Sequence, residues 1–373
     1  MDEYTLKTTT EPLTTTKRQY WVDYLRIFSS FLVVLIHVSA IGWYNTVLTK
    51  NWISSTIFSS LAHCAVPLFF MISGMFLLDT KKELPIKKLL LHNFFKIYSI
   101  YVISMLGYGA WMLLQIHTLQ SLPLDSLNSI LYILFQGNSY LWFLPALCGI
   151  YLLLPLLRII TGSGEKGKKA IEYYLIIFML IRLSVYTISA LNLSTFLDIQ
   201  LNTYLSFVPF NNYLAYFFLG YYLNTYGLSK KLTYLVKGLF IPSVLFLTGI
   251  PILQLYLNRP VNQNIFDSFS IFTYITTINL FLFFKSRKKR TLSTRAEKVL
   301  ITCSNCTLSI YVLHAFVIDV LTKLGISIWL GPFYISIPLI TLFVFLITLL
   351  LSYLLHLLRI LFLALFHLFK KTN

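Results

Sequence analysis

The sequence has little charge, and acidic residues are the scarcest. Charged residues make up 12% of its 373 residues, and Asp and Glu together number 13, whereas soluble globular proteins contain about 25% charged residues. Hydrophobic residues reach 57%, and the mean hydropathy is +0.74. This composition excludes a disordered chain, a coiled coil and an ordinary soluble enzyme. It predicts an integral membrane protein whose apolar surface faces lipid.

Cysteine is also scarce, with four residues in the chain. Cys64 and Cys148 fall within apolar runs, where cysteine is typically a small core residue. Cys303 and Cys306 have CxxC spacing, but a zinc site needs about four ligands, and neither a second pair nor a histidine lies nearby in the sequence. We therefore expect no metal site and no permanently bound cofactor.

A cleavable signal peptide is missing as well. The first apolar run, residues 20–44, is too long for the hydrophobic region of a signal peptide and instead predicts a first membrane span. The Thr-rich segment 1–19 is expected to be a disordered cytoplasmic tail, and residues 361–373 a basic cytoplasmic tail. The membrane domain would then occupy residues 20–360.

Long apolar runs, by contrast, are abundant. Each of ten runs is long enough to cross about 30 Å of hydrocarbon, which predicts an all-α, polytopic bundle of about ten transmembrane helices. The runs cover residues 20–44, 53–78, 92–117, 140–160, 171–192, 208–226, 233–257, 267–285, 299–322 and 333–358. The sixth run is the weakest, because Asn211 and Asn212 interrupt it.

The basic residues predict how these spans are oriented. The formal net charge is +17, but the Lys and Arg residues lie in short loops, so we expect no nucleic-acid partner. Of the 30 basic residues, 24 fall in the termini and alternate loops of one side, and only Lys50, Arg259 and Lys323 lie on the other. Because cytoplasmic loops carry an excess of Lys and Arg, we expect a multi-pass plasma-membrane protein with both termini in the cytoplasm.

Three basic residues remain within the spans, namely Arg26, Lys96 and Arg182. An ionisable residue at membrane depth is a candidate for function, because burying an unpaired charge is costly. Lys96 fits equally well as a side chain that reaches the cytoplasmic interface. Arg182 lies in mid-span, where Asp319 offers a structural partner, although the sequence does not place these two helices together.

The first span combines Asp23, Arg26 and His37. Arg26 and His37 are separated by almost three helical turns, so both project from one helix face with a rise of about 16 Å between them. Arg26 would present a fixed cation to an anionic group that arrives from the cytoplasm, and His37 a titratable base further out. The alternative is that His37 is a structural residue whose ring forms its hydrogen bonds within the core.

Five ordered motifs give the sequence a family resemblance. They are Trp21–Arg26 followed by His37, Val66–Gly74, Leu141–Leu144 followed by Tyr151 and Pro155, Phe217–Gly220, and Ser309–His314. Together they resemble the membrane acyltransferase type 3 family, and most closely its stand-alone bacterial surface-polysaccharide O-acetyltransferases. The resemblance covers nearly the whole chain after residue 19.

The resemblance implies a bundle of about ten helices that transfers an acyl group, usually acetyl, from cytoplasmic acyl-CoA to a hydroxyl of a surface polysaccharide or glycolipid. Acetyl-CoA would be a donor substrate, and the other partners would be the glycan acceptor and the lipid bilayer. The resemblance associates Arg26 with acyl-CoA handling and His37 with catalysis. A neutral imidazole suits this chemistry, because it can take the proton of an attacking hydroxyl.

The sequence departs from the family pattern in the third span. Many members carry Arg-x-x-Arg there, whereas this chain has Asn93 and Lys96 at the nearest register. Lys87 and Lys88, just before, are candidates to hold CoA phosphates as point charges. Some members also carry a hydrolase-like domain after their spans. We expect none here, so the acceptor would meet the membrane domain directly.

Other residues are candidates for the same pocket, and a second function stays open. His314 lies at a depth similar to that of His37, while Trp142 suits either an interface anchor or a ring that stacks on the acceptor. Asp23 and Arg182 complete the candidates. The alternative function is a membrane transporter or exporter of a polysaccharide or small polar molecule, because buried polar residues in ten spans would suit one too.

Overall fold

The computed structural model describes residues 18–44, 46–81, 83–119, 131–133, 139–191, 213–287 and 292–372. All regular secondary structure in these ranges is helical, and no strand occurs within them. The predicted all-α class is therefore confirmed. The N-terminal segment expected to be a tail lies almost entirely outside the described residues.

Within the described ranges, seven stretches of helix are long and apolar enough to cross a membrane. They are α1 (Tyr20–Trp43), α2 with α3 (Lys50–Ala62, Ala65–Leu77), α4 with α5 (Ile86–Lys88, Phe95–Leu119), α7 (Phe143–Gly162), α8 with α9 (Gly164–Phe178, Ser184–Ala190), α13 with α14 (Lys230–Gly238, Phe240–Tyr256) and α18 (Phe333–Thr372). Short π-helical turns, Leu89–Phe94 and Met179–Leu183, join the two halves of the third and fifth stretches.

Together, α16 (Thr294–Asn305) and α17 (Thr307–Lys323) are also long and apolar enough to cross a membrane, but they meet at a bend of 58°, as in a broken span or a re-entrant loop. Two further helices, α12 (Leu214–Thr225) and α15 (Ile271–Lys285), are shorter. Each of the ten predicted runs thus contains a helix in its described part, and the polytopic bundle is confirmed.

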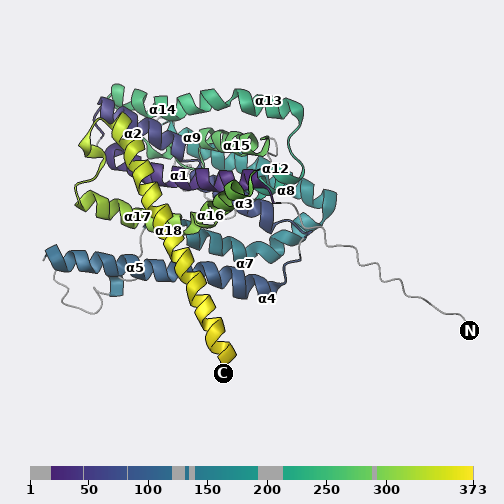
Figure 1. Ribbon diagram of the computed structural model, residues 1–373. Helices are drawn as coiled ribbons and strands as arrows, with labels where there is room; N and C mark the ends of the chain where they lie inside the picture. The colour runs from purple at the N-terminus through teal and green to yellow at the C-terminus, as the bar shows by residue number, and fades with distance from the viewer. Residues whose placement is uncertain are drawn as a thin grey trace, which may run out of the picture.

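The helices lie mostly side by side, while α18 runs obliquely across the bundle and packs against α1, α2 and α17 (Figure 1). The connections α3–α4, α7–α8 and α12–α13 lie at one end, on the right of Figure 1. Hydrogen bonds tie that end together, because Arg158 Nη1 donates to the carbonyls of Leu77 and Asp79 at 2.7 and 3.0 Å. Three of the basic loops of the sequence therefore lie at one end of the bundle. That this end faces the cytoplasm stays a prediction.

Two glycines allow α3 and α12 to touch backbone to backbone. A Cβ atom on Gly74 would lie 1.9 Å from the carbonyl oxygen of Phe217, and one on Gly220 would lie 2.0 Å from that of Met71. Any side chain at either position would force the helices apart, so glycine is required. This contact lies in the main buried core, beside α1, which packs against α2, α3, α15, α16, α17 and α18. The central position of α1 sets the place of the candidate site.

Candidate active site

Arg26 and His37 both lie on α1, which runs unbroken from Tyr20 to Trp43. An unbroken helix keeps them on one face, about 16 Å apart along its axis. Both side chains are partly buried. The structure therefore gives the first span the cation and imidazole in the arrangement that the sequence predicts.

His37 lies in a cluster of three rings contributed by three segments. Its ring centroid is 4.9 Å from that of His314 on α17 and 4.5 Å from that of Tyr140, in the 3₁₀ turn Ser139–Leu141. The two imidazoles are inclined by 31°. The structure thus brings together His37 and His314, two of the predicted site residues, and adds Tyr140.

Tyr311 holds this cluster in place. Its hydroxyl donates to the carbonyl oxygen of Tyr140 at 2.5 Å and accepts from the backbone N–H of Phe143 at 3.2 Å. Tyr311 is buried, so these bonds fix the 3₁₀ turn to α17 in a low-dielectric setting. Sequence reasoning did not single out Tyr140 or Tyr311, although each lies within or directly beside a family motif.

Tyr108 on α5 anchors the same stretch of α17 from another side. Its hydroxyl donates to the carbonyl oxygen of Val312 at 2.8 Å and accepts from the backbone N–H of Phe316 at 3.0 Å. Tyr108 therefore satisfies backbone groups on either side of His314. This contact is a second one that the sequence did not predict.

His314 is 1% exposed and has a defined protonation pattern. Its Nδ1 lies 2.6 Å from the carbonyl oxygen of Tyr311. A carbonyl oxygen only accepts, so Nδ1 carries the proton and the neutral ring presents Nε2 as an acceptor. Nε2 is buried and has no hydrogen-bond partner among the described residues.

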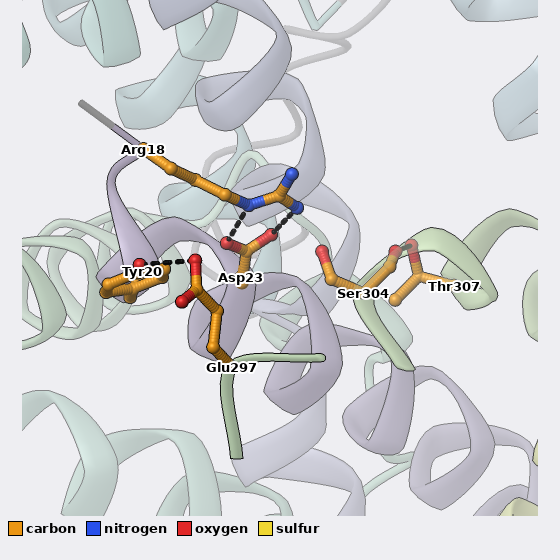
Figure 2. Close-up of polar contacts among 6 residues, drawn as sticks. All are labelled: Arg18, Tyr20, Asp23, Glu297, Ser304 and Thr307. Atoms are coloured by element: carbon orange, nitrogen blue, oxygen red, sulfur yellow. Dashed lines mark hydrogen bonds and ion pairs between the residues drawn. The ribbon is translucent and has the colours of Figure 1, made fainter. Parts of the chain in front are cut away.

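The other end of α1 is held by two polar contacts (Figure 2). Arg18 donates from Nε and Nη2 to the carboxylate of Asp23 at 2.9 and 2.8 Å, and the hydroxyl of Tyr20 donates to Glu297 on α16 at 2.6 Å. The hydrogen bond to Asp23 raises the pKa of Arg18, so this guanidinium stays charged. Asp23 is 3% exposed, and Arg18 neutralises its buried charge.

Ser304 lies next to this ion pair, and its hydroxyl points toward Asp23 (Figure 2). The hydroxyl is buried and has no partner in the part of the chain that the structure describes. The backbone carbonyl of Ser304 accepts from Thr307 at 2.9 Å, at the bend between α16 and α17. At this end of the site, the Ser304 hydroxyl is therefore a buried polar group without a hydrogen-bond partner in the described chain.

Arg26 lies one turn further along α1 than Asp23. Its guanidinium carbon is 5.5 Å from the centre of the Phe76 ring on α3. Within the described ranges it forms no ion pair and no hydrogen bond. A partly buried guanidinium without a carboxylate is suited to a phosphate or carboxylate ligand.

The three lysines expected near the donor lie on the surface. Lys87 and Lys88 are in α4, Lys96 is in the first turn of α5, and all three side chains are exposed. Figure 1 shows α4 at the same end of the bundle as the start of α1. The three lysines add positive charge to this end, but they do not form a shared binding pocket with Arg26.

The structure contradicts the suggested pairing of Arg182 with Asp319. Arg182 donates to the hydroxyl of Tyr186 at 2.9 Å and lies over the rings of Tyr186 and Phe269 at 4.2 and 5.0 Å. Asp319 instead accepts from Trp111 and Gln115 at 2.6 and 2.8 Å. Each charge is satisfied by nearby polar or aromatic groups, so the pairing is wrong.

Trp142 caps the start of α7, two residues after Tyr140. Its side chain is 39% exposed, and its ring lies 5.0 Å from that of Tyr213. Tyr213 lies 5.1 Å from Phe269, the ring beneath Arg182. A row of aromatic rings thus connects the surface near the histidines with Arg182.

The described residues include no group of three His, Cys, Asp or Glu side chains that could hold a metal ion. Comparison with known proteins adds one finding about the whole chain. A protein-family model described as an acyltransferase domain matches residues 19–357. No curated protein and no solved structure matches the chain.

Proposed function

The chain belongs to the acyltransferase type 3 family, and from this premise we propose that it moves an acetyl or similar acyl group from cytoplasmic acyl-CoA to a hydroxyl of a cell-surface polysaccharide or glycolipid. The family match and the several apolar helices of membrane-spanning length together identify the protein as a multi-pass membrane acyltransferase. The donor, the acceptor and the sidedness are the proposed part.

One observation carries the proposal, namely the shared face of α1. Arg26 has no carboxylate partner in the described chain, and it lies toward the end where three of the basic loops lie. His37 lies about 16 Å further along the same helix, inside the ring cluster with His314. An extended pantetheine arm whose phosphates are held near Arg26 would bring its thioester to His37.

The reaction then needs one proton acceptor. Neutral His37 takes the proton of the acceptor hydroxyl while that oxygen attacks the thioester carbonyl. The carbon–sulfur bond breaks as the tetrahedral intermediate collapses, and the imidazolium returns the proton to the leaving CoA sulfur. The products are an O-acyl ester and free CoA, and His37 is neutral again.

A transporter, the alternative from the sequence, is less well supported. Export does not require a basic imidazole in line with an intramembrane cation, and the matching family model describes an acyltransferase domain. We therefore retain acyl transfer as the function of the site.

The test uses the full chain in inside-out membrane vesicles, where the cytoplasmic face is accessible. Acetyl-CoA labelled in the acetyl group is added outside, with extracted envelope polysaccharide or glycolipid inside. We expect base-labile label on the glycan, and none with His37→Gln. His356→Gln, on α18 and outside the site, is the matched control. A folded protein that labels no glycan from any envelope fraction would contradict the proposal.

The proposed sidedness has its own test. Ser286 is exposed and follows α15 in the basic loop, so Ser286→Cys should resist a membrane-impermeant thiol reagent added to intact cells. Lys50→Cys, on the side with few basic residues, should react. Labelling of Ser286→Cys from outside would reverse the orientation.

A further inference from the structure

We propose that His314 is a positioning residue for His37. Its Nε2 accepts a hydrogen bond from the His37 imidazole and thereby selects the His37 tautomer whose other nitrogen is bare and faces the acceptor hydroxyl. This inference rests on the proposed role of His37 as the base.

The first step of the argument is the fixed tautomer of His314. Because the carbonyl of Tyr311 holds the proton on Nδ1 at 2.6 Å, the ring can offer only an acceptor at Nε2. That nitrogen is fully buried and unpaired within the described chain. A buried acceptor without a donor is unfavourable, so Nε2 requires a donor from a neighbouring group or a substrate.

The second step is the position of the neighbouring imidazole. The ring centroids of His314 and His37 are 4.9 Å apart, about the separation at which two imidazoles share one N–H···N hydrogen bond. The His37 imidazole makes no hydrogen bond with any described residue, so its tautomer is not fixed by the protein in this conformation. The bond forms when the His37 ring turns toward His314.

The third step separates the two histidines by access. His314 is 1% exposed, whereas His37 is only partly buried. A glycan hydroxyl can therefore meet the partly exposed His37 but not the buried His314. This order makes His37 the group that takes the proton and His314 the group that orients it.

The fourth step is rigidity, because an orienting group must itself be held. Tyr108 bonds to the backbone carbonyl of Val312 and the backbone N–H of Phe316, on either side of His314. Tyr311, three residues before His314, bonds to the backbone of the turn Ser139–Leu141 and of α7. The same Tyr311 hydroxyl fixes Tyr140, whose ring lies 4.5 Å from that of His37. One stretch of α17 thus sets two of the surfaces that surround the His37 ring.

The proton balance is simple. The acceptor hydroxyl gives its proton to the bare nitrogen of His37, while the other nitrogen keeps its own proton in the bond to His314. The resulting imidazolium donates to His314 Nε2 and is stabilised by it. The proton then leaves from the first nitrogen to the CoA sulfur, and His314 never changes its protonation.

The test is ¹⁵N NMR of the full chain in nanodiscs with labelled imidazoles, with His37→Gln and His314→Gln used for assignment. In the unmodified chain we expect one His37 tautomer, and in His314→Ala a mixture of both. His314→Met, which fills the volume without an acceptor, should give the same mixture and serves if the alanine variant does not fold. The remaining histidines of the seven report folding, namely His63, His92, His117, His356 and His367. A single, unchanged His37 tautomer in both variants would overturn the proposal.

Kinetics provide the second readout. Loss of the orienting group should lower kcat by about 10–100-fold in His314→Ala, as for other partners that orient a functional imidazole, with KM for acetyl-CoA unchanged. His314→Gln keeps an acceptor at a similar position and should recover most of the loss. Equal inactivity of the Gln and Ala variants would make His314 a proton carrier and overturn positioning. Full activity of His37→Gln would instead refute the proposed base, and the NMR result would stand independently.

Discussion

The two ends of α1 are built in opposite ways. Around His37, α5, α17 and the turn Ser139–Leu141 are tied together by buried and partly buried hydrogen bonds between tyrosine hydroxyls and backbone groups. Around Arg26, one ion pair at the helix start is partly exposed, and the nearby lysines lie free on the surface. One end is suited to hold reacting atoms in a fixed geometry, and the other to attract a charged and flexible ligand.

This contrast follows from the physical chemistry of each setting. Hydrogen bonds in the low-dielectric core are strong and fix geometry, and acyl transfer needs the base placed accurately. Exposed charges contribute about 0–1 kcal/mol each and are screened by salt, yet several of them raise the local concentration of an anion. Variants near His37 should therefore change kcat, and variants near Arg26 should change KM.

The sharpest test of this division is His37→Gln. Removing the proton acceptor should lower kcat by about 10²–10⁴-fold, while the Kd for acetyl-CoA changes little. Radiolabelled acetyl transfer and calorimetry in detergent measure the two quantities on one preparation. A raised Kd for acetyl-CoA with a normal kcat would instead assign His37 to donor binding. The proposed difference between the two ends of α1 would then be wrong.

Arg26→Gln should give the reverse pattern. Hydrogen bonds to charged groups contribute about 1.5–3 kcal/mol, so the Kd for acetyl-CoA should rise by about 10–100-fold. At saturating donor, kcat should remain close to that of the unmodified protein. Calorimetry with acetyl-CoA and with dephospho-CoA would identify which phosphate Arg26 contacts, and unchanged affinity for both would remove Arg26 from the donor site.

Tyr311→Phe tests whether the geometry of the His37 cluster depends on the hydrogen bonds of the Tyr311 hydroxyl. The change leaves the Tyr140 carbonyl and the Phe143 N–H unpaired, which should lower stability by about 1–3 kcal/mol and kcat by about tenfold. Thermal unfolding and transfer assays measure both. Tyr274→Phe is the control, because Tyr274 is also buried but its hydroxyl makes no hydrogen bond within the described chain. Equal losses in the two variants would show that burial alone matters.

Arg18→Gln tests the ion pair at the start of α1. The variant strands the Asp23 carboxylate, which is 3% exposed, and should lower stability by about 1–3 kcal/mol. Arg18→Gln with Asp23→Asn removes both charges and should restore most of the stability. Thermal unfolding of the single and double variants measures this coupling, and additive losses would show that the pair contributes nothing as a pair.

The sequence predicts local features of this molecule well. Apolar runs predict where helices lie, and the 3.6-residue period places Arg26 and His37 on one face because both belong to one unbroken helix. The close α3–α12 contact depends in the same local way on Gly74 and Gly220, which end two of the family motifs and have no side chain. These features depend on residues within a single helix or on the absence of a side chain.

Contacts between distant helices could not be predicted in the same way. The approach of Tyr140 and His314 to His37 depends on how three segments pack, and a single sequence carries no distance between them. The pairing of Arg182 with Asp319, which the sequence left open, does not occur, because each side chain has partners closer to it. Tyr186, four residues after Arg182, and Lys323, four residues after Asp319, lie on the same helical faces.

The smallest expected effect concerns the surface lysines, and it tests the Arg26 end of α1 most directly. Lys87 and Lys88 are exposed and form no ion pair among the described residues, so Lys87→Gln with Lys88→Gln should raise KM for acetyl-CoA by about threefold or less at physiological salt. Because the effect is a long-range attraction, it should grow at low ionic strength and vanish at about 1 M salt, where the Debye length is about 3 Å.

The matched control is Lys230→Gln with Lys231→Gln, which removes the same charge at the same end of the bundle but at the α12–α13 connection. If both double variants raise KM equally, the whole positive end attracts the donor and Lys87 and Lys88 have no special place. If only Lys87→Gln with Lys88→Gln does so, and the difference persists at high salt, these lysines bind CoA phosphates directly. The Arg26 end of α1 would then also hold its ligand by a fixed contact. It would differ from the His37 cluster only in how many such contacts it has.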